Sequence, residues 1–273
     1  IIDCSRPDLT VLPMTIRFGE EEYLDGVNIT GPDIYQRLHN GELPQTSLPR
    51  VEDFSAKLRE IFDLGYDGVI AVMLSSGLSG TYNLARIVAE ECREQGRAMV
   101  AFDSLSGSLG LGMTVLQLAE DIRNGMGWEE LTQHRAPQLI ANTYPFFTLD
   151  TLEYLKRGGR ISKTVALAGG LLNIKPVVTV RDGEVVLIGK ARGSKQGNNL
   201  LAEKIHTCGG IDFSLPILLG YSGLSDAFLK KYVEDSRSLW QDGAEKLDAT
   251  LISGVIGTHT GPGVVAAAFF RKH

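Results

Sequence analysis

Two adjacent serines stand where an apolar run ends and a helical pattern begins. Residues 69–74 are all apolar, which is typical of a strand covered on both faces, and Ser75 and Ser76 follow at once. Ligands of open parallel sheets bind at the carboxyl ends of the strands, and a helix N-terminus there offers free N–H groups to an anion. The serines could therefore bind an anion, or they could only cap the helix.

Two further turns carry donors of the same kind. Thr46 and Ser47 precede a helical pattern over residues 51–61, and we expect the Ser47 hydroxyl to cap that helix. His259 lies in the glycine-rich run 257–263 between two apolar stretches, which we interpret as a tight polar turn. A lone histidine is more often structural than functional, but here it could donate a hydrogen bond to an anion.

The elements that must position these turns differ between the two halves of the chain. The first half alternates apolar strands, at 69–74 and 98–102, with helices, at 82–92 and 109–124. This alternation predicts a parallel sheet with right-handed crossovers. The second half changes character after about Thr148, and Arg181-Asp182-Gly183 between two valine-rich runs predicts a β-hairpin.

We therefore predict an α/β protein of two domains. Residues 1–147 should form an N-terminal domain with a parallel sheet in a three-layer α/β arrangement. Residues 148–273 should form a second α/β domain with a mixed sheet and helices packed on it. No low-complexity linker separates the halves, so a ligand site between them is expected.

The composition excludes several classes of protein. The 273 residues are 43% apolar and 22% charged, with a formal charge of −6 and no long basic run, which argues against sequence-independent nucleic-acid binding. There is no uninterrupted apolar run of about 18 residues that could span a membrane. Cys4, Cys92 and Cys208 lack metal-ligand spacing and are odd in number, so we expect free thiols, no metal and a cytoplasmic location.

The motifs taken together resemble the DegV family, the fatty-acid-binding subunits of bacterial fatty acid kinase. The resemblance spans nearly the whole chain. It rests on Ser-Ser-Gly-Leu-Ser-Gly-Thr at 75–81, Pro-Gln-Thr-Ser at 44–47, the serine- and glycine-rich run 103–112, the run 151–162 with Asn-Ile-Lys-Pro at 173–176, and the turn 257–263. Thr260 stands where the family has valine. The opening Asp3-Cys4-Ser5 is followed by a shorter loop than the family has, and the chain starts without methionine, so we expect residues to be missing there.

The resemblance implies a non-catalytic carrier that buries a long-chain fatty acid between its domains. The carboxylate donors would be Thr46, Ser76 and His259, supported by the backbone around Ser75, Gly77, Ser79 and Gly80. The carrier would present the carboxylate to a partner kinase for acyl-phosphate formation in phospholipid synthesis, and it would need no cofactor. Arg160, Arg192 and Lys195 would dock the kinase, although residues 190–195 also fit a solvated basic turn. A monomer with transient membrane contact is expected.

Two other functions remain open at this point. A serine hydrolase could use Ser76 or Ser79 with His259 and either Asp103 or Asp150, but no Gly-x-Ser-x-Gly surrounds these serines. A dinucleotide-binding enzyme could use residues 107–112 as a phosphate loop, although their spacing is not Gly-x-Gly-x-x-Gly.

Overall fold

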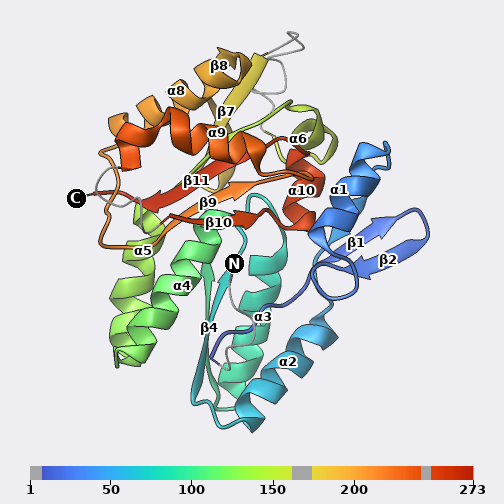
Figure 1. Cartoon of the computed structure of the whole chain (residues 1–273). Coiled ribbons are helices and arrows are strands. Elements are labelled where there is room, and N and C mark those ends of the chain that lie inside the picture. Colours follow the sequence, from blue (N-terminus) through green and yellow to red (C-terminus); the bar gives the residue numbers. More distant parts are fainter. Residues whose placement is uncertain (1–7, 162–173, 241–246, 273) are drawn as a thin grey trace.

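A computed structural model describes residues 8–161, 174–240 and 247–272. The opening Asp3-Cys4-Ser5, together with Ser162 and Asn173 of the family motifs, lies outside the described residues. Within them the chain forms three sheets (Figure 1). The predicted α/β class, with a parallel sheet and a mixed sheet, is confirmed.

The parallel sheet pairs β4 (Gly68–Met73) with β5 (Ala98–Asp103) in register. Helix α3 (Thr81–Glu94) packs on these strands, and α2 (Val51–Asp63) packs on α3. The other face of β4 meets α4 (Leu109–Arg123). Because both faces are covered, the two strands are almost entirely apolar, as the sequence predicts.

The mixed sheet has six strands in the order β10-β9-β11-β6-β7-β8. Its strands are β6 (Thr143–Thr148), β7 (Ile174–Arg181), β8 (Glu184–Arg192), β9 (Ile217–Tyr221), β10 (Leu247–Leu251) and β11 (Val265–Phe270). Strands β7 and β8 form the predicted hairpin, with Asp182 and Gly183 at positive φ in its turn. Strand β6 belongs to the mixed sheet, although five of its six residues (143–147) lie on the N-terminal side of the predicted boundary after 147, and the division there stays a prediction.

Helices cover both faces of this sheet. One face carries α8 (Gly193–Thr207) and α9 (Ala227–Asp235), which is followed by the short helix η2 (Arg237–Trp240). The other face carries α4, which is therefore shared between the two sheets. The π-helix η1 (Glu130–Arg135) and α5 (Ala136–Asn142) follow α4 and pack against it. The largest buried cluster contains residues of α4, β6 and β7, such as Met113, Phe147 and Val178, so the core is continuous across the sheets.

A small antiparallel sheet, in the order β2-β1-β3, stands beside these layers (Figure 1). It comprises β1 (Thr15–Phe18), β2 (Glu21–Leu24) and β3 (Gln45–Ser47), with α1 (Gly31–His39) between β2 and β3. Thr46 therefore lies in a strand. Ser47 is the last residue of that strand, and α2 begins only at Val51 without a side-chain cap, so the predicted capping by Ser47 is wrong. Pro49 delays the helix because the residue before a proline disfavours helical geometry.

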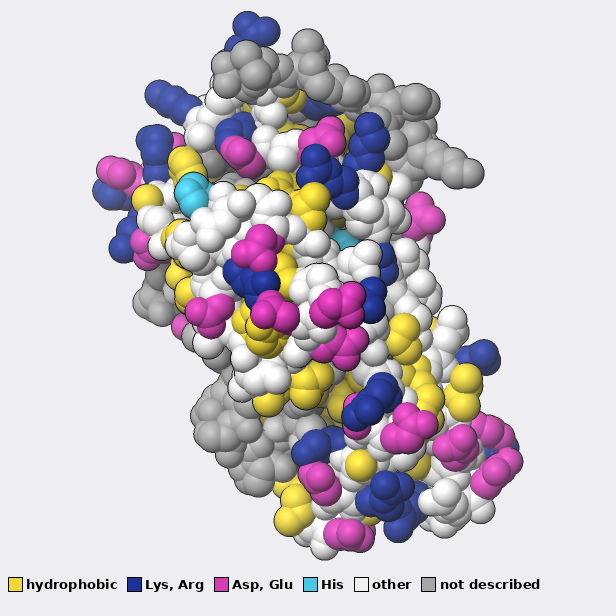
Figure 2. All heavy atoms as spheres, turned by 90° about the vertical axis from the view of Figure 1, so that its right-hand side faces the viewer, with side chains coloured by type: hydrophobic (Ala, Val, Ile, Leu, Met, Phe, Trp, Pro, Cys, Tyr) yellow, Lys and Arg dark blue, Asp and Glu magenta, His cyan; other side chains and the backbone are white. Residues whose placement is uncertain are grey.

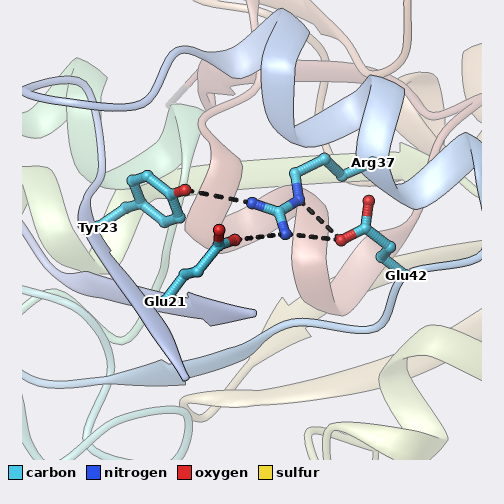
Figure 3. Close-up of polar contacts among 4 residues, drawn as sticks. All are labelled: Glu21, Tyr23, Arg37 and Glu42. Carbon is cyan, nitrogen blue, oxygen red and sulfur yellow. Dashed lines mark hydrogen bonds and ion pairs between the residues drawn. The ribbon is translucent and has the colours of Figure 1, made fainter. Parts of the chain in front are cut away.

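Arg37 ties this small sheet to α1 (Figure 3). Its guanidinium donates to Glu21 of β2 at 2.7 Å and to Glu42, three residues before β3, at 2.8 Å. It also stacks 3.9 Å from the centre of the Phe18 ring. These contacts lower the pKa of the Glu21 carboxyl. The cluster fixes the path of the chain that leads to Thr46.

Figure 2 views the molecule from the side of α1, β1 and β2, where acidic, basic and apolar side chains are interspersed. Among the described helices, none has the length and apolar character needed to cross a bilayer. Cys92 and Cys208 are free thiols, as predicted, and burial raises the pKa of both.

Candidate functional site

A largely apolar cavity lies between the serine loop, the mixed sheet and α10 (Gly254–Thr260). Eleven of its lining residues are aliphatic, aromatic or methionine side chains, and Arg160 alone carries a full charge among those that line it. The lining residues are Met14, Thr46, Leu74, Leu78, Ser79, Gly107, Ser108, Phe147, Leu149, Leu155, Arg160, Val178, Thr179, Val180, Val185, Val255, Ile256, His259 and Thr260. A chain of methylene groups is the chemistry that such walls favour.

Thr46 and His259 form the polar end of the cavity. The Thr46 Oγ1 atom lies 2.8 Å from His259 Nε2, although the two residues are 213 positions apart in sequence. The structure therefore brings together two of the three predicted carboxylate donors. His259 does not lie in a turn, as the sequence interpretation had it, but in α10, whose backbone continues to Thr260 before Gly261 turns away at φ 75°.

Helix α10 is held by the small sheet and α1. The Asp25 carboxylate accepts the N–H groups of Gly254 and Val255 at 3.2 and 2.9 Å, which satisfies two free donors of the first helical turn. Gly257 faces Tyr35, and a Cβ there would lie 2.5 Å from the tyrosine oxygen. These contacts could not be found from sequence because Asp25 and Tyr35 belong to no recognised motif. They fix where the His259 ring stands.

His259 is largely buried and uncharged at neutral pH. Burial, with a contribution from the nearby Arg160 guanidinium, lowers its pKa to about 4. The Nδ1 atom is buried without a hydrogen-bond partner among the described residues. Gly158 packs against this atom, since a Cβ on Gly158 would lie 2.2 Å from Nδ1. Gly158 follows the short helix α6 (Glu153–Arg157), so the family's Gly-Gly-Arg run forms one wall around the imidazole.

The three serines of the serine loop have different surroundings. Ser75 is fully buried, and its hydroxyl donates to the Gly183 carbonyl at 2.7 Å, so it is engaged away from the cavity. Ser76 is exposed, does not line the cavity, and has its N–H directed at the Asp103 carboxylate. Ser79, two residues before α3, does line the cavity. The structure thus places Ser79, and not Ser76, beside the polar end. Gly77 and Gly80 flank it without lining the cavity.

The three cations predicted to dock the kinase lie in two different places. Arg192 and Lys195 are exposed at the start of α8, and neither lines the cavity. Arg160 does line it, and its guanidinium donates to the carbonyl oxygens of Leu78 at 3.1 Å and Gly158 at 2.6 Å. Arg160 therefore bridges the α6 region and the serine loop at the same end of the cavity as His259.

The geometry does not support the serine hydrolase. His259 Nε2 meets Thr46, and Nδ1 has no carboxylate partner in the described part of the chain. Asp103 accepts N–H groups of Ser76 and Leu105, and Asp150 pairs with Lys175. The described residues also contain no cluster of His, Cys, Asp and Glu able to hold a metal ion.

The run 107–112 does not form an open phosphate loop. It leads into α4, and a Cβ on Gly110 would collide with the Ser106 hydroxyl at 2.2 Å. Gly110 therefore serves the close packing of α4, whereas Gly107 and Ser108 line the largely apolar cavity.

Comparison with known proteins gives a consistent result. A family model described as an uncharacterised protein of the DegV family matches residues 4–272. A DegV domain-containing protein of Clostridium acetobutylicum is 33% identical over 268 residues, covering 97% of this chain and 92% of that protein.

Two solved structures are similar over almost their full length. One, from Thermus thermophilus, is described as fatty acid binding of a DegV family protein; it has a TM-score of 0.86, 31% identity and coverage of 98% of this chain and 94% of that one. The other, a stearic-acid-binding protein of Eubacterium ventriosum, has a TM-score of 0.84, 27% identity and coverage of 98% and 93%.

Proposed function

This chain belongs to the DegV family, and on that premise we propose that it is a carrier that binds a long-chain fatty acid. The observation that supports this most directly is the cavity itself, with apolar walls and the Thr46–His259 pair at one end. Burying about fourteen methylenes at roughly 0.8 kcal/mol each contributes on the order of 11 kcal/mol before the costs of association. The tail would then dominate affinity.

The carboxylate would be held by Thr46, Ser79 and His259. A buried anion without partners is very costly, so each hydroxyl or N–H that faces it has a measurable effect. His259 is neutral at pH 7 and can donate from Nε2 once the carboxylate displaces the Thr46 contact. Ser79 replaces Ser76 as the proposed serine donor because Ser79 lines the cavity. Arg160 adds positive charge at that end without a bidentate clamp, since its Nε and Nη1 donors already bind backbone carbonyls.

Native mass spectrometry of the purified protein tests this proposal. We expect a retained ligand with the mass of a long-chain fatty acid, which is released under denaturing conditions and returns when the delipidated protein is mixed with palmitate or oleate. Protein that neither retains nor rebinds an acid would refute it.

The carrier would deliver its acid to a kinase that supplies ATP and forms the acyl phosphate. No Gly-x-x-x-x-Gly-Lys-Ser/Thr loop occurs in the sequence, and a carboxylate held by neutral donors keeps a lone pair free for attack on phosphorus. Arg192 and Lys195 would dock the kinase, because both are exposed and outside the cavity. ATP-dependent formation of acyl phosphate by a fatty acid kinase catalytic subunit, only when this chain is present, is the result that supports this step. A chain that binds acid but never supports acyl-phosphate formation would refute it.

A further inference from the structure

A second pocket lies on the other face of the mixed sheet. In β6, Phe147 lines the largely apolar cavity and the next residue, Thr148, lines this second pocket, because successive side chains of a strand point to opposite faces. Helix α8 covers this face beside α9 (Figure 1), and a Cβ on Gly197 of α8 would lie 3.1 Å from Thr148 Cγ2. The lining residues are Thr148, Lys175, Ser194, Asn198, Phe228, Lys231, Gly263 and Val265. None of them lines the first cavity, so the two sites are separate.

Hydrogen-bond donors from four different elements line this pocket. They are the hydroxyls of Thr148 in β6 and Ser194 in α8, and the ammonium groups of Lys175 in β7 and Lys231 in α9. None of the described residues that line it is acidic. Such a set suits an anion that accepts hydrogen bonds on several sides, and a phosphate group offers at least three acceptor oxygens.

Thr148 carries a hydroxyl for which the described part of the chain provides no partner. The residue is 6% exposed, and its Oγ1 atom is buried without a hydrogen bond. Thr179, which is buried in the same sheet, instead donates to the Pro145 carbonyl at 2.7 Å. A buried polar group without a partner destabilises the fold, and valine would fill the same space without that cost. A ligand oxygen in the pocket would give the Thr148 hydroxyl its partner.

The two lysines keep donors for a ligand although each already has a carboxylate partner. Lys175 pairs with the exposed Asp150, and Lys231 Nζ lies 3.1 Å from Asp235 Oδ1. Asn198 also donates to Asp235, at 3.0 Å, which ties α8 to α9. Neither carboxylate lines the pocket, and each ammonium group has three N–H donors. The ion pairs therefore hold the ammonium groups beside the pocket and leave N–H groups for an anion.

The first turn of α8 adds positive potential at the same place. Arg192, at the N-cap, makes no side-chain hydrogen bond to this turn, and Ser194 within the turn lines the pocket. The free N–H groups and the dipole at the start of a 15-residue helix favour an anion. Lys195 lies close enough to contribute to the lowered pKa of Asp235, of which the hydrogen bond from Asn198 is the largest cause. A third lysine thus adds to the positive charge around the pocket.

We propose that this pocket binds a phosphate group, either as inorganic phosphate or as the phosphoryl group of a larger molecule. The inference goes beyond the proposed function and does not depend on fatty-acid binding. The Thr148 and Ser194 hydroxyls donate to the phosphate oxygens, and Lys175 and Lys231 balance the negative charge.

Calorimetric titration of the delipidated protein tests this proposal, with inorganic phosphate and methyl phosphate added separately at constant ionic strength. Saturable binding of at least one of them is expected. Binding of methyl phosphate at least as tight as that of inorganic phosphate identifies the phosphoryl group of a larger molecule as the ligand, whereas a preference for inorganic phosphate identifies the free ion. No saturable binding of either up to about 10 mM overturns the proposal.

Thr148→Val and Lys175→Gln are the variants that locate the binding. Thr148→Val keeps the shape of the side chain, and we expect about tenfold weaker phosphate binding without a lower Tm of the ligand-free protein, since no hydrogen bond is broken. Lys175→Gln should weaken phosphate binding by about tenfold or more, because it removes a charged donor. Lys230→Gln is the matched control, since Lys230 is an exposed cation next to Lys231 that does not line the pocket.

Loss of phosphate affinity in Thr148→Val and Lys175→Gln, with native affinity in Lys230→Gln, supports the site. Native phosphate affinity in both pocket variants, or an equal loss in Lys230→Gln, overturns it. Thr148→Val should also keep native affinity for palmitate, because Thr148 does not line the fatty-acid cavity. Equal loss of phosphate and palmitate binding in this variant would show a general effect on the fold and would also overturn the site.

Discussion

The polar end of the cavity and the basic turn at the start of α8 were both predicted from sequence, yet they lie in different physical environments. Thr46 and His259 are in contact at 2.8 Å, and burial of the imidazole lowers its pKa to about 4. Arg192 and Lys195 are exposed to solvent. Water screens exposed charges and weakens their interactions, whereas a buried polar group depends on each of its partners.

This difference separates two kinds of contribution. Groups at the polar end should change how tightly an acid is held and how the fold responds to pH. Groups at the basic turn should change how fast a partner associates, with little effect on the acid. The following predictions test that separation, from the largest expected effect to the smallest.

The largest effect concerns stability in acid. The pKa of His259 is about 4 in the folded chain, against about 6.5 when unfolded, so below pH 6.5 the unfolded chain takes up a proton that the folded chain refuses. Stability should therefore fall as pH drops from 6.5 to 4, by about 3 kcal/mol from this group. Urea unfolding of delipidated protein across this range measures it. In His259→Gln the free energy of unfolding should depend less on pH between 6.5 and 4. The same pH dependence in both proteins would contradict a buried, neutral His259.

The next effect concerns the carboxylate donors. Thr46→Ala and Ser79→Ala should each weaken fatty-acid binding by about 1–3 kcal/mol, because each removes a donor to a buried anion. Ser76→Ala is the matched control on the same loop and should keep native affinity, since Ser76 is exposed and outside the cavity. Calorimetric titration with palmitate measures all three. Loss of affinity in Ser76→Ala alone would restore Ser76, the donor that the family resemblance suggests, in place of Ser79.

A smaller effect concerns Arg160. Its positive charge contributes to the low pKa of His259, so Arg160→Gln should raise that pKa, although not to 6.5, because burial is the larger cause. NMR titration of the imidazole measures the shift. Lys156→Gln on α6 serves as the control, because its exposed charge is not among the causes of the shift. An unchanged pKa in Arg160→Gln would show that burial alone acts on His259.

The smallest effect on acid binding is expected at the basic turn. Arg192→Ala and Lys195→Glu should alter fatty-acid affinity by no more than about 0.5 kcal/mol, as is usual for surface substitutions. Acyl-phosphate formation with the kinase should fall in both and become less sensitive to salt. Lys230→Ala, an exposed cation on α9, is the control. If Arg192→Ala and Lys195→Glu lose bound fatty acid but still support acyl-phosphate formation, the basic turn binds the acid and does not dock the kinase.

Much of the fold was predictable because its signals are local. The apolar runs that became β4 and β5, the Asp182-Gly183 turn and the helical segments that became α3 and α4 were all predicted from residues that are close together in sequence. Of the two errors, the first has a local cause and the second does not. Pro49 displaced the start of α2 from Ser47, and the glycine-rich run around His259 formed a helix because Asp25, far away in sequence, caps it.

By itself the sequence determined the residue types of the site, a threonine, a serine loop and a histidine, and the apolar segments that surround them. Only the tertiary structure decided which serine faces the cavity, because Ser75, Ser76 and Ser79 share one motif but differ in contacts with the Gly183 turn, Asp103 and the cavity. The same holds for the Thr46–His259 contact and for the neutral state of the imidazole. Burial and approach between segments more than 100 positions apart are properties of packing, which no local pattern encodes.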